Sequence, residues 1–230
     1  MARRFALTVI ALCGTSAVIY SVYLHQSLSR KVKHRSGIGL LTVDENKTVI
    51  ESLPAELADP SQFHIVNDVA SKSVPTSQLR STDPDLLLTK YLQRSMSCFS
   101  RFPQALLLRL VFKTAEAKET FKASYIQKLN FAPGDTVCGG YRVVVRTGNR
   151  VEFEMLTPEG FPPINGRLLT SIQQKGEQTV FVTETLQWRR REDKGILPLE
   201  RKLMRWLHEL AGWWLLETGT NWLCSSQLGP

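Results

Sequence analysis

Residues 199–216 read LERKLMRWLHELAGWWLL, and this stretch predicts a long amphipathic helix near the end of the chain. Its apolar side chains recur at intervals of three and four residues, which places them on one face of a helix. The charged side chains at 200–202 and 205 fall on the opposite face. Because a helix with one broad apolar face must bury that face, we expect a sheet beneath it. The apolar face comprises Leu203, Trp206, Leu207, Leu210, Trp213 and Trp214.

The chain before this helix changes to the alternating pattern of strands after a Pro-Gly-Asp turn at residues 133–135. Short turns separate the alternating runs, as at residues 147–149, and such short connections favour antiparallel neighbours. We therefore predict a curved antiparallel sheet of at least four strands. These strands span Thr136–Arg146, Arg150–Leu156, Arg167–Gln173 and Thr179–Trp188.

Three helical segments are predicted before the sheet. The first begins with Thr82 as its cap, followed by Asp83 and Pro84, and its leucines recur four residues apart. The second covers Ala105–Phe112, and the third covers Ala115–Leu129. Together these elements predict an α+β domain over residues 82–223, in which the C-terminal helix packs across the sheet. Residues 224–230 are expected to form a flexible tail.

The N-terminal stretch Phe5–Leu24 reads FALTVIALCGTSAVIYSVYL and carries no charge. Twenty helical residues cover the roughly 30 Å hydrocarbon core of a bilayer, so residues 1–35 predict a single-pass transmembrane anchor with basic flanks. The alternative is a signal peptide cleaved near residues 15–17. Cations on both flanks favour a cytoplasmic domain, whereas the glycosylation sequon at Asn46 leaves a luminal one open. Residues 36–81 are interpreted as a linker and irregular segment, in which Leu40–Val43 and Thr48–Ile50 can pair as a hairpin.

Charge and motif content argue against several functional classes. The formal net charge is +8, but six of the cations flank the apolar N-terminal segment, and the first 36 residues contain no acid. The excess on the rest of the chain is too small to expect a nucleic-acid-binding surface. The sequence lacks the standard nucleotide, hydrolase and metalloprotease motifs, and it has only four histidines. We therefore expect no metal site and no cofactor.

Four stretches carry a family resemblance: FSRFPQA at Phe99–Ala105, the GD-x-VCG-x-Y pattern at Gly134–Tyr141, the tripeptide at 166–168, and PLERKLMRWLHELAGWWLL at 198–216. Together they resemble a family of membrane-anchored fungal proteins, several of which accompany secondary-metabolite pathways. The layout also resembles the helix-grip (START-like) class, in which a curved sheet wraps a long C-terminal helix around an apolar cavity. An NTF2-like or other cone-shaped α+β fold is the alternative. The resemblance supplies no catalytic residue.

Three side chains are candidates for acid–base chemistry in such a cavity. Glu184 shares a strand face with apolar residues, and burial raises the pKa of a carboxyl group toward the range that suits proton transfer. His208 lies beside the apolar stripe of the C-terminal helix, and Tyr141 offers a hydroxyl group. In the alternative orientation of the last strand, Glu184 faces solvent, and Phe181, Thr183 and Thr185 point into the cavity.

Aromatic side chains of the predicted helices and sheet are candidates for the cavity wall, because such rings would contact a terpenoid, polyketide or lipid. Each also suits a packed core. The sequence thus predicts a hydrophobic small molecule as partner, and a membrane-tethered cyclase or isomerase that uses no cofactor. One alternative is a lipid or metabolite carrier without chemistry, and another is a membrane-anchored interaction protein. The candidate wall residues are Trp206, Trp213, Phe153 and Tyr125.

Overall fold

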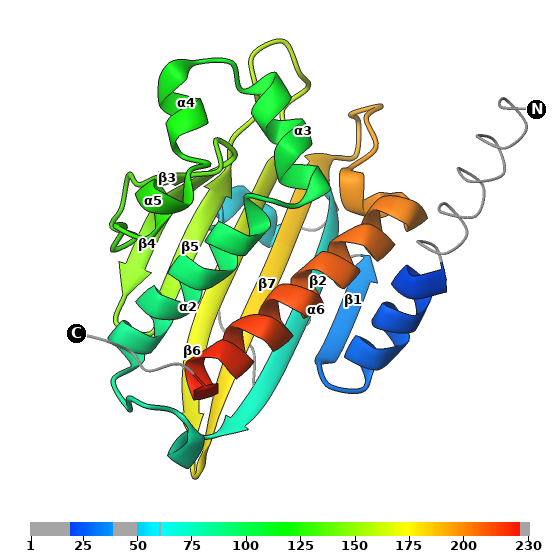
Figure 1. Ribbon diagram of the computed structural model, residues 1–230. Helices are drawn as coiled ribbons and strands as arrows, with labels where there is room; N and C mark the ends of the chain where they lie inside the picture. The colour runs from blue at the N-terminus through cyan, green and yellow to red at the C-terminus, as the bar shows by residue number, and fades with distance from the viewer. Residues whose placement is uncertain (1–18, 39–49, 60, 226–230) are drawn as a thin grey trace, which may run out of the picture.

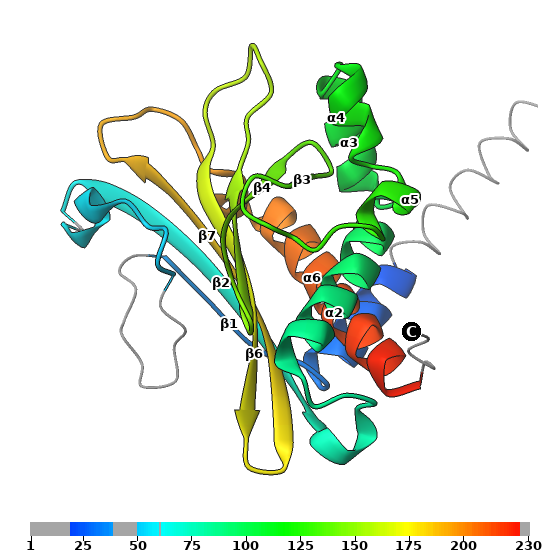
Figure 2. The same ribbon diagram turned by 90° about the vertical axis from the view of Figure 1, so that its left-hand side faces the viewer.

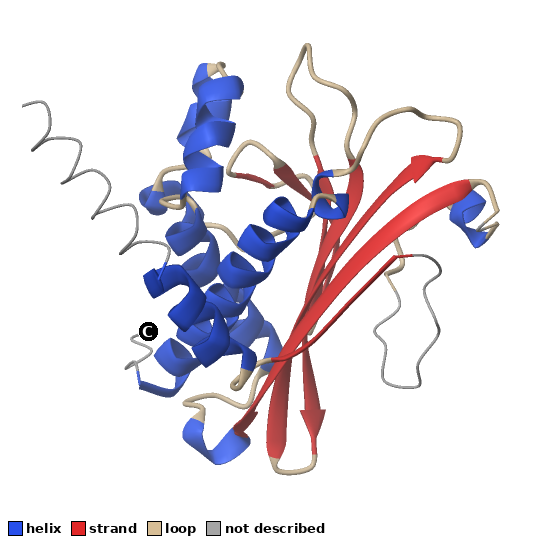
Figure 3. Ribbon diagram, turned by 90° about the vertical axis from the view of Figure 1, so that its right-hand side faces the viewer, coloured by secondary structure: helices blue, strands red, loops and turns tan. Residues whose placement is uncertain are grey.

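The computed structural model describes residues 19–38, 50–59 and 61–225. One antiparallel sheet forms a layer, and the helices that pack on it lie over one of its faces (Figures 1 and 2). The two layers are seen side by side when the ribbon is coloured by secondary structure (Figure 3). The fold is therefore of the α+β class, as the helical and alternating sequence patterns predict.

The described residues form seven strands: β1 (Lys33–Ile38), β2 (Phe63–Pro75), β3 (Thr136–Val137), β4 (Tyr141–Thr147), β5 (Arg150–Met155), β6 (Asn165–Lys175) and β7 (Gln178–Arg190). They make one sheet in the order β1-β2-β7-β6-β5-β4-β3, and each strand is antiparallel to its neighbours. The predicted meander is confirmed as β4 to β7. Its last turn uses Gly176 at φ 59°, a left-handed conformation that glycine adopts without steric cost.

The described residues after β2 form five α-helices: α2 (Pro84–Phe99), α3 (Pro103–Val111), α4 (Ala115–Glu119), α5 (Ala123–Ile126) and α6 (Lys202–Ser225). Residues 19–29 are also helical. α2 begins with Asp83 as its N-cap rather than Thr82, because the Asp83 carboxylate accepts a hydrogen bond from the Asp85 amide at 3.0 Å. α6 lies across the sheet as predicted and extends nine residues beyond the predicted end at Leu216, while residues 198–200 form a 3-10 turn.

The helix predicted for Ala115–Leu129 is instead divided into α4 and α5, because Thr120 forms hydrogen bonds with the two residues that follow β3. The Thr120 carbonyl accepts a hydrogen bond from the Cys138 amide at 3.1 Å. Its hydroxyl accepts one from the Gly139 amide at 2.8 Å. These bonds compete with continuation of the helix, so two short helices flank this point.

β1 and β2 occupy residues that the sequence predicts as tether and linker, and this interpretation is wrong for both strands. β2 is 13 residues long and pairs with β7 along its whole length. In the sequence, the prolines at 54, 60 and 75 argue against a strand here, because proline interrupts most strands. In the structure Pro54 precedes the strand and Pro75 is its last residue, so neither disturbs the paired interior, and Pro60 lies outside the described residues.

Apolar side chains are buried on both faces of the sheet. The larger core lies between the sheet and the helices, and it includes buried leucines of α2 together with Phe181 of β7. The smaller core lies on the other face, where residues 50–57 contribute Ile50 and Leu57. Both faces of β7 are therefore protected from water. The strand residues of the smaller core are Phe63, Ile65, Leu169, Leu186 and Trp188.

Most of the predicted anchor Phe5–Leu24 lies outside the described residues, as do the sequon at Asn46, most of the predicted hairpin at 40–50 and the end of the tail after residue 225. Of the anchor, the structure describes residues 19–24 as part of a helix. Within the described ranges, no helix combines the length and the apolarity that a membrane span needs. Residues 28 and 32 belong to the main core, so the chain that follows the predicted anchor packs against the domain.

Candidate functional site

A cavity lies between the sheet and helices α2 and α6, where the sequence predicts one. Its volume is about 160 Å³, and most of its lining is apolar. Pockets for drug-sized ligands begin at about 300 Å³, whereas an engineered apolar cavity of about 150 Å³ in another protein binds benzene. The cavity is therefore suited to a group the size of one small ring. Strands β2, β4, β5, β6 and β7 form its floor, and α2 and α6 form its roof.

Asp68 and His208 meet at the wall of this cavity. β2 points Asp68 toward the helices, and α6 places His208 Nε2 3.4 Å from Asp68 Oδ2. The Asp68 side chain is 8% exposed and that of His208 is 33% exposed, so the carboxylate is covered while the imidazole remains accessible. The other carboxylate oxygen, Oδ1, is buried without a hydrogen-bond partner among the described residues. A buried polar atom without a partner is costly, so a donor group on a ligand would be stabilised there.

This pair has the arrangement of a general base and the group that orients it. A carboxylate beside one imidazole nitrogen stabilises the imidazolium that forms when the ring takes a proton. Asp68 contacts Nε2 of His208, which leaves Nδ1 as the nitrogen that can exchange a proton with a ligand. The arrangement thus supports proton transfer at the edge of an apolar cavity.

Hydroxyl groups of the sheet and α2 also line the cavity. Thr185 lies directly opposite Asp68 in the register of β2 and β7, and such cross-strand neighbours have Cβ atoms about 5 Å apart. Thr183 and Thr170 form the next row across the same face. Burial raises the pKa of Tyr91, on α2, to about 12, so its hydroxyl stays protonated and donates hydrogen bonds.

Tyr141 lines the cavity as predicted, but it lies at the opposite edge from His208. Four strand spacings separate β4, which carries Tyr141, from β2, which carries Asp68; this corresponds to about 19 Å between the two backbones. Burial, with a smaller effect from Cys138, raises the pKa of Tyr141 to about 12. Tyr141 is therefore suited to donate a hydrogen bond at its own edge of the cavity and not to exchange protons with His208.

No protein-family model matches this chain, and no curated protein matches it. Among solved structures, the chain is similar to CalU16 from Micromonospora echinospora, which is known from a crystal structure. The two share 9% sequence identity over 84% of this chain and 99% of CalU16, with a TM-score of 0.34. That likeness is too distant to assign a family or a function.

Glu184 lies on the other face of the sheet, so the prediction that it points into the cavity is wrong. Its neighbours Thr183 and Thr185 line the cavity instead, in agreement with the alternative orientation. Glu184 is 1% exposed and pairs in register with Val69 and Leu169. The alternation of β7 does not decide its orientation because both faces of this strand are buried, so apolarity does not distinguish them.

Phe153 and Tyr125, two of the predicted wall residues, do not line the cavity. Phe153 points toward the helices but is fully buried in the main core, where its ring lies 6.3 Å from that of Phe131. Tyr125, on α5, packs at the edge of the same core. Burial and the neighbouring Asp135 raise the pKa of Tyr125. Both side chains therefore serve packing in this structure.

Trp206 and Trp213, the other predicted wall residues, lie on a different side of α6 from the cavity. Trp213 is 1% exposed, and its ring lies 4.7 Å from that of His25 and 4.3 Å from that of His34. Trp206 stacks with His25 at 5.6 Å. The two tryptophans thus hold residues 19–38 against α6, and the cavity wall on α6 is built from smaller side chains.

Asp68 is the site residue that the sequence did not reveal. It lies within the run HIVNDVA, where His64, Val66, Asp68 and Ala70 share one strand face. A carboxylate on an alternating, mainly apolar face is the same signal that singled out Glu184, so it would have been found had residues 63–75 been recognised as a strand. Among the described residues, no three His, Cys, Asp or Glu side chains are placed to hold a metal ion.

Proposed function

We propose that this protein binds a small, mainly apolar molecule in the cavity and moves a proton on it, as a cofactor-free isomerase or cyclase. The observation that carries this proposal is the Asp68–His208 pair on an otherwise mainly apolar wall. A histidine beside a buried carboxylate that lacks a full set of hydrogen bonds is a frequent feature of proton-transfer sites. The pair needs no cofactor to act as a base and then as an acid.

The volume of the cavity sets the size of the group that it can enclose. At about 160 Å³ it suits a group about as large as benzene. A complete terpenoid, polyketide or lipid is larger than this. We therefore propose that one ring or one short branch of such a molecule enters the cavity, while the remainder stays outside it beside His208. The resemblance to proteins of secondary-metabolite pathways supports this substrate class.

In the proposed reaction, His208 Nδ1 removes a proton from a carbon next to a carbonyl group. Asp68 stabilises the imidazolium that results. The hydroxyl of Thr185, opposite Asp68, donates a hydrogen bond to the carbonyl oxygen as that oxygen gains negative charge. Return of the proton to a different carbon completes an isomerisation, with no net change in hydrogens or electrons, and the apolar wall holds the ligand in the reactive orientation.

A carrier without chemistry is the second candidate. It is favoured by the mainly apolar lining and by polar groups that are mostly neutral hydroxyls, such as those of Tyr91 and Tyr141. Both candidates predict ligand binding in the same cavity. They differ in whether His208 changes the ligand.

Deuterium uptake by cyclohexanone separates the two candidates, because this ketone is close to benzene in size and carries exchangeable protons beside its carbonyl group. We expect the full chain to accelerate uptake from D2O, measured by NMR, and His208→Gln to reduce the acceleration by about a hundredfold. Fluorine NMR of fluorobenzene measures occupancy of the cavity in both proteins. Binding without exchange would support the carrier and refute the catalyst, and absence of both would refute both proposals.

We also propose that residues 5–24 tether the domain to a membrane, with the domain on the cytoplasmic side. The uncharged run of twenty residues and the cations on its flanks support this arrangement. The full chain should then stay with membranes during alkaline carbonate extraction, and its C-terminus should be digested by protease added from the cytoplasmic side. Release by carbonate would refute the tether, and a glycan on Asn46 would reverse the orientation.

A further inference from the structure

α3 buries one apolar side and exposes a second. Ala105 is fully buried and Leu108 packs against the main core, which accounts for the inner side of the helix. On the outer side, Leu106, Leu107 and Leu110 are 49%, 64% and 72% exposed. Three neighbouring exposed leucines on a helix of nine residues form an apolar surface that needs a partner other than water.

The start of α6 also exposes apolar side chains. Leu203 and Met204 are 67% and 40% exposed. The Gln104 side chain donates a hydrogen bond to the Leu207 carbonyl at 3.5 Å, so the first turn of α3 adjoins the beginning of α6. We call the exposed apolar side chains of the two helices together the α3–α6 face, and define it by Leu106, Leu107, Leu110, Leu203 and Met204.

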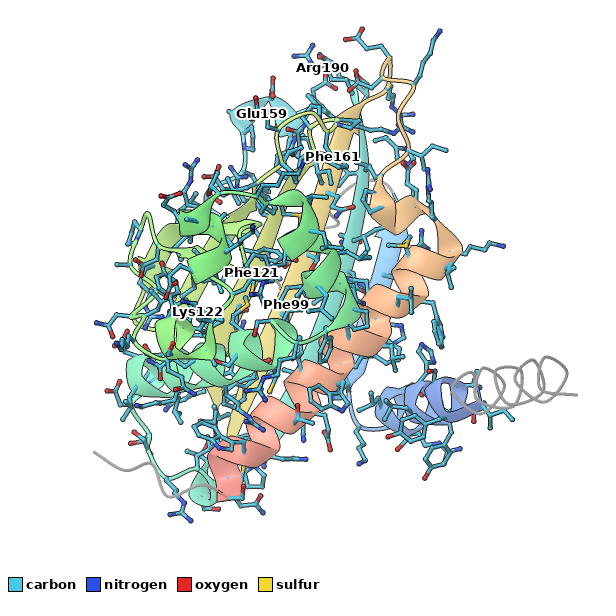
Figure 4. The ribbon with its side chains drawn as sticks, turned by 45° about the horizontal axis from the view of Figure 1, so that its top comes forward. Phe99, Phe121, Lys122, Glu159, Phe161 and Arg190 are labelled. Carbon is cyan, nitrogen blue, oxygen red and sulfur yellow. The ribbon has the colours of Figure 1, made fainter. Side chains whose placement is uncertain are left out.

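Phe161 lies at the same end of the molecule. It is 54% exposed on the loop between β5 and β6, and Figure 4 shows it at the end where Arg190 also lies. The register agrees, because Asn165 at the start of β6 pairs with Trp188 near the end of β7. The chain then leads from Arg190 to the start of α6, so this end of the sheet and the α3–α6 face lie together.

Four exposed cations lie on or next to the α3–α6 face. Arg109 and Lys113 are exposed on and just after α3, and Arg201 and Lys202 are exposed at the start of α6. The acids of the neighbouring α6 region are already paired: Glu200 with His64 and Arg189, and Glu209 with His25. Glu116 on α4 is the next acid after α3 in the chain, and the exposed acids Glu159, Glu192 and Asp193 lie on the loops at this end. An apolar surface with a basic rim is complementary to a bilayer that contains anionic lipid.

The chain that follows the predicted anchor approaches the domain from this end. His25 lies 5.6 Å from the Trp206 ring and 3.7 Å from Glu209, whereas Lys31 lies 3.4 Å from Glu217. The helix of residues 19–29 therefore runs in the same direction as α6, and its first residues lie toward the start of α6 (Figure 1). Exposed apolar residues of that helix are Ile19, Tyr20, Val22 and Tyr23.

We propose that the α3–α6 face docks on an anionic lipid bilayer, with its leucines at the boundary of headgroups and acyl chains and its cations among the headgroups. A lipid surface is favoured over a protein partner because the apolar side chains, the basic rim and the entry of the N-terminal helix all lie at one end. In this orientation the His208 wall of the cavity, one helical turn beyond Met204, lies close to the membrane. The docking proposal does not depend on any chemistry in the cavity.

Amide hydrogen exchange of the full chain, measured by mass spectrometry, tests this proposal. The chain is compared in nanodiscs of phosphatidylcholine with and without phosphatidylserine. We expect peptides at the start of α6 to exchange at least about threefold more slowly with phosphatidylserine, while the β6–β7 turn at the other end of the sheet is unchanged. The double variant Leu107→Glu and Leu110→Glu should abolish this protection.

Two further variants control the experiment. Leu86→Glu replaces an exposed leucine at the start of α2 and should keep the protection, because this residue lies away from the α3–α6 face. Arg109→Ser with Lys202→Ser keeps the leucines and should lose only the preference for phosphatidylserine, so it tests the proposal even if the leucine variant unfolds. Equal exchange with both lipids and in all variants would overturn the proposal. Protection that depends on protein concentration and not on lipid would assign the face to a second copy of the chain, and would also overturn it.

Discussion

Gly212 gives a direct test of whether the space beneath α6 is open. It lines the cavity, and a methyl group added to its Cα would meet no atom within 4 Å. Gly212→Ala should therefore stabilise the protein. The change gains about 1 kcal/mol in helix propensity, and burial of the methyl group adds about 0.8 kcal/mol. The sum of about 2 kcal/mol should raise Tm by about 4 to 8 °C for a domain of this size.

Gly219→Ala is the matched control, because Gly219 lies in the same helix and its substitution has the same propensity gain. Its methyl group would lie 2.7 Å from Tyr91 Cε2 and 2.9 Å from Ser95 Oγ, so α2 and α6 would have to move apart. Overpacking of this kind costs about 1 to 3 kcal/mol, which exceeds the propensity gain in most of that range. We expect Gly219→Ala to lower Tm by a few degrees.

Thermal unfolding followed by circular dichroism measures both shifts. A larger change, Gly212→Leu, should leave the protein folded and abolish fluorobenzene binding and cyclohexanone exchange together, because four added carbons occupy the cavity. The reasoning is refuted if Gly212→Ala lowers Tm as Gly219→Ala does, since the space would then be filled. It is also refuted if Gly212→Leu binds fluorobenzene as the unmodified chain does.

Three further predictions concern the site and its support. Asp68→Asn keeps the size of the side chain but removes the charge that orients His208, so cyclohexanone exchange should fall by at least about tenfold while fluorobenzene affinity is retained; unchanged exchange would exclude Asp68 from the mechanism. Burial alone would raise the pKa of Glu217, but bonds that include one from Lys72 outweigh burial and hold this pKa below its ordinary value of 4.5. The contribution of the ionised Glu217 to stability is fully present above about pH 4.5 and is lost as the pH falls through the pKa of Glu217 in the folded state. The free energy of unfolding in urea should therefore depend less on acid pH in Glu217→Gln than in the unmodified chain. Gly166→Ala would place a methyl group 2.9 Å from a backbone oxygen of β7, and we expect it to lower the free energy of unfolding by about 1 to 3 kcal/mol in the same urea assay.

The parts of the fold that the sequence predicts correctly are those that a local pattern of turns, caps or residue spacing marks. Tight turns join β4 to β5 and β6 to β7, and α2 has a distinct start and leucines at helical spacing, so local patterns are sufficient for these elements. β2 is different because its pairing partner, β7, lies far along the chain. Its role in the sheet depends on that long-range pairing, which no local pattern contains.

The candidate site was predictable only in part, for a related reason. His208 and Tyr141 stand out by residue type, and the structure places both at the cavity. Glu184 stands out equally. Residues 50–57 bury the other face of the sheet, however, so both faces of β7 are buried and its alternating pattern does not show to which face Glu184 points. The Asp68–His208 contact joins β2 to α6 and requires the tertiary structure.

The cavity persists because the side of α6 that holds the helix in place differs from the side that lines the cavity. Trp213 packs against residues 19–38, and the Glu217 carboxylate is bound by Lys72 of β2, so groups outside the cavity hold the helix in place. Toward the sheet, α6 presents the methyl group of Ala211 and the bare backbone of Gly212, and volume remains where larger side chains would fill it. The hollow is therefore a consequence of residue size at two positions and not of loose packing of the helix. It follows that truncation of Trp213 should destabilise the fold, whereas enlargement of Gly212 should remove the site and stabilise the fold.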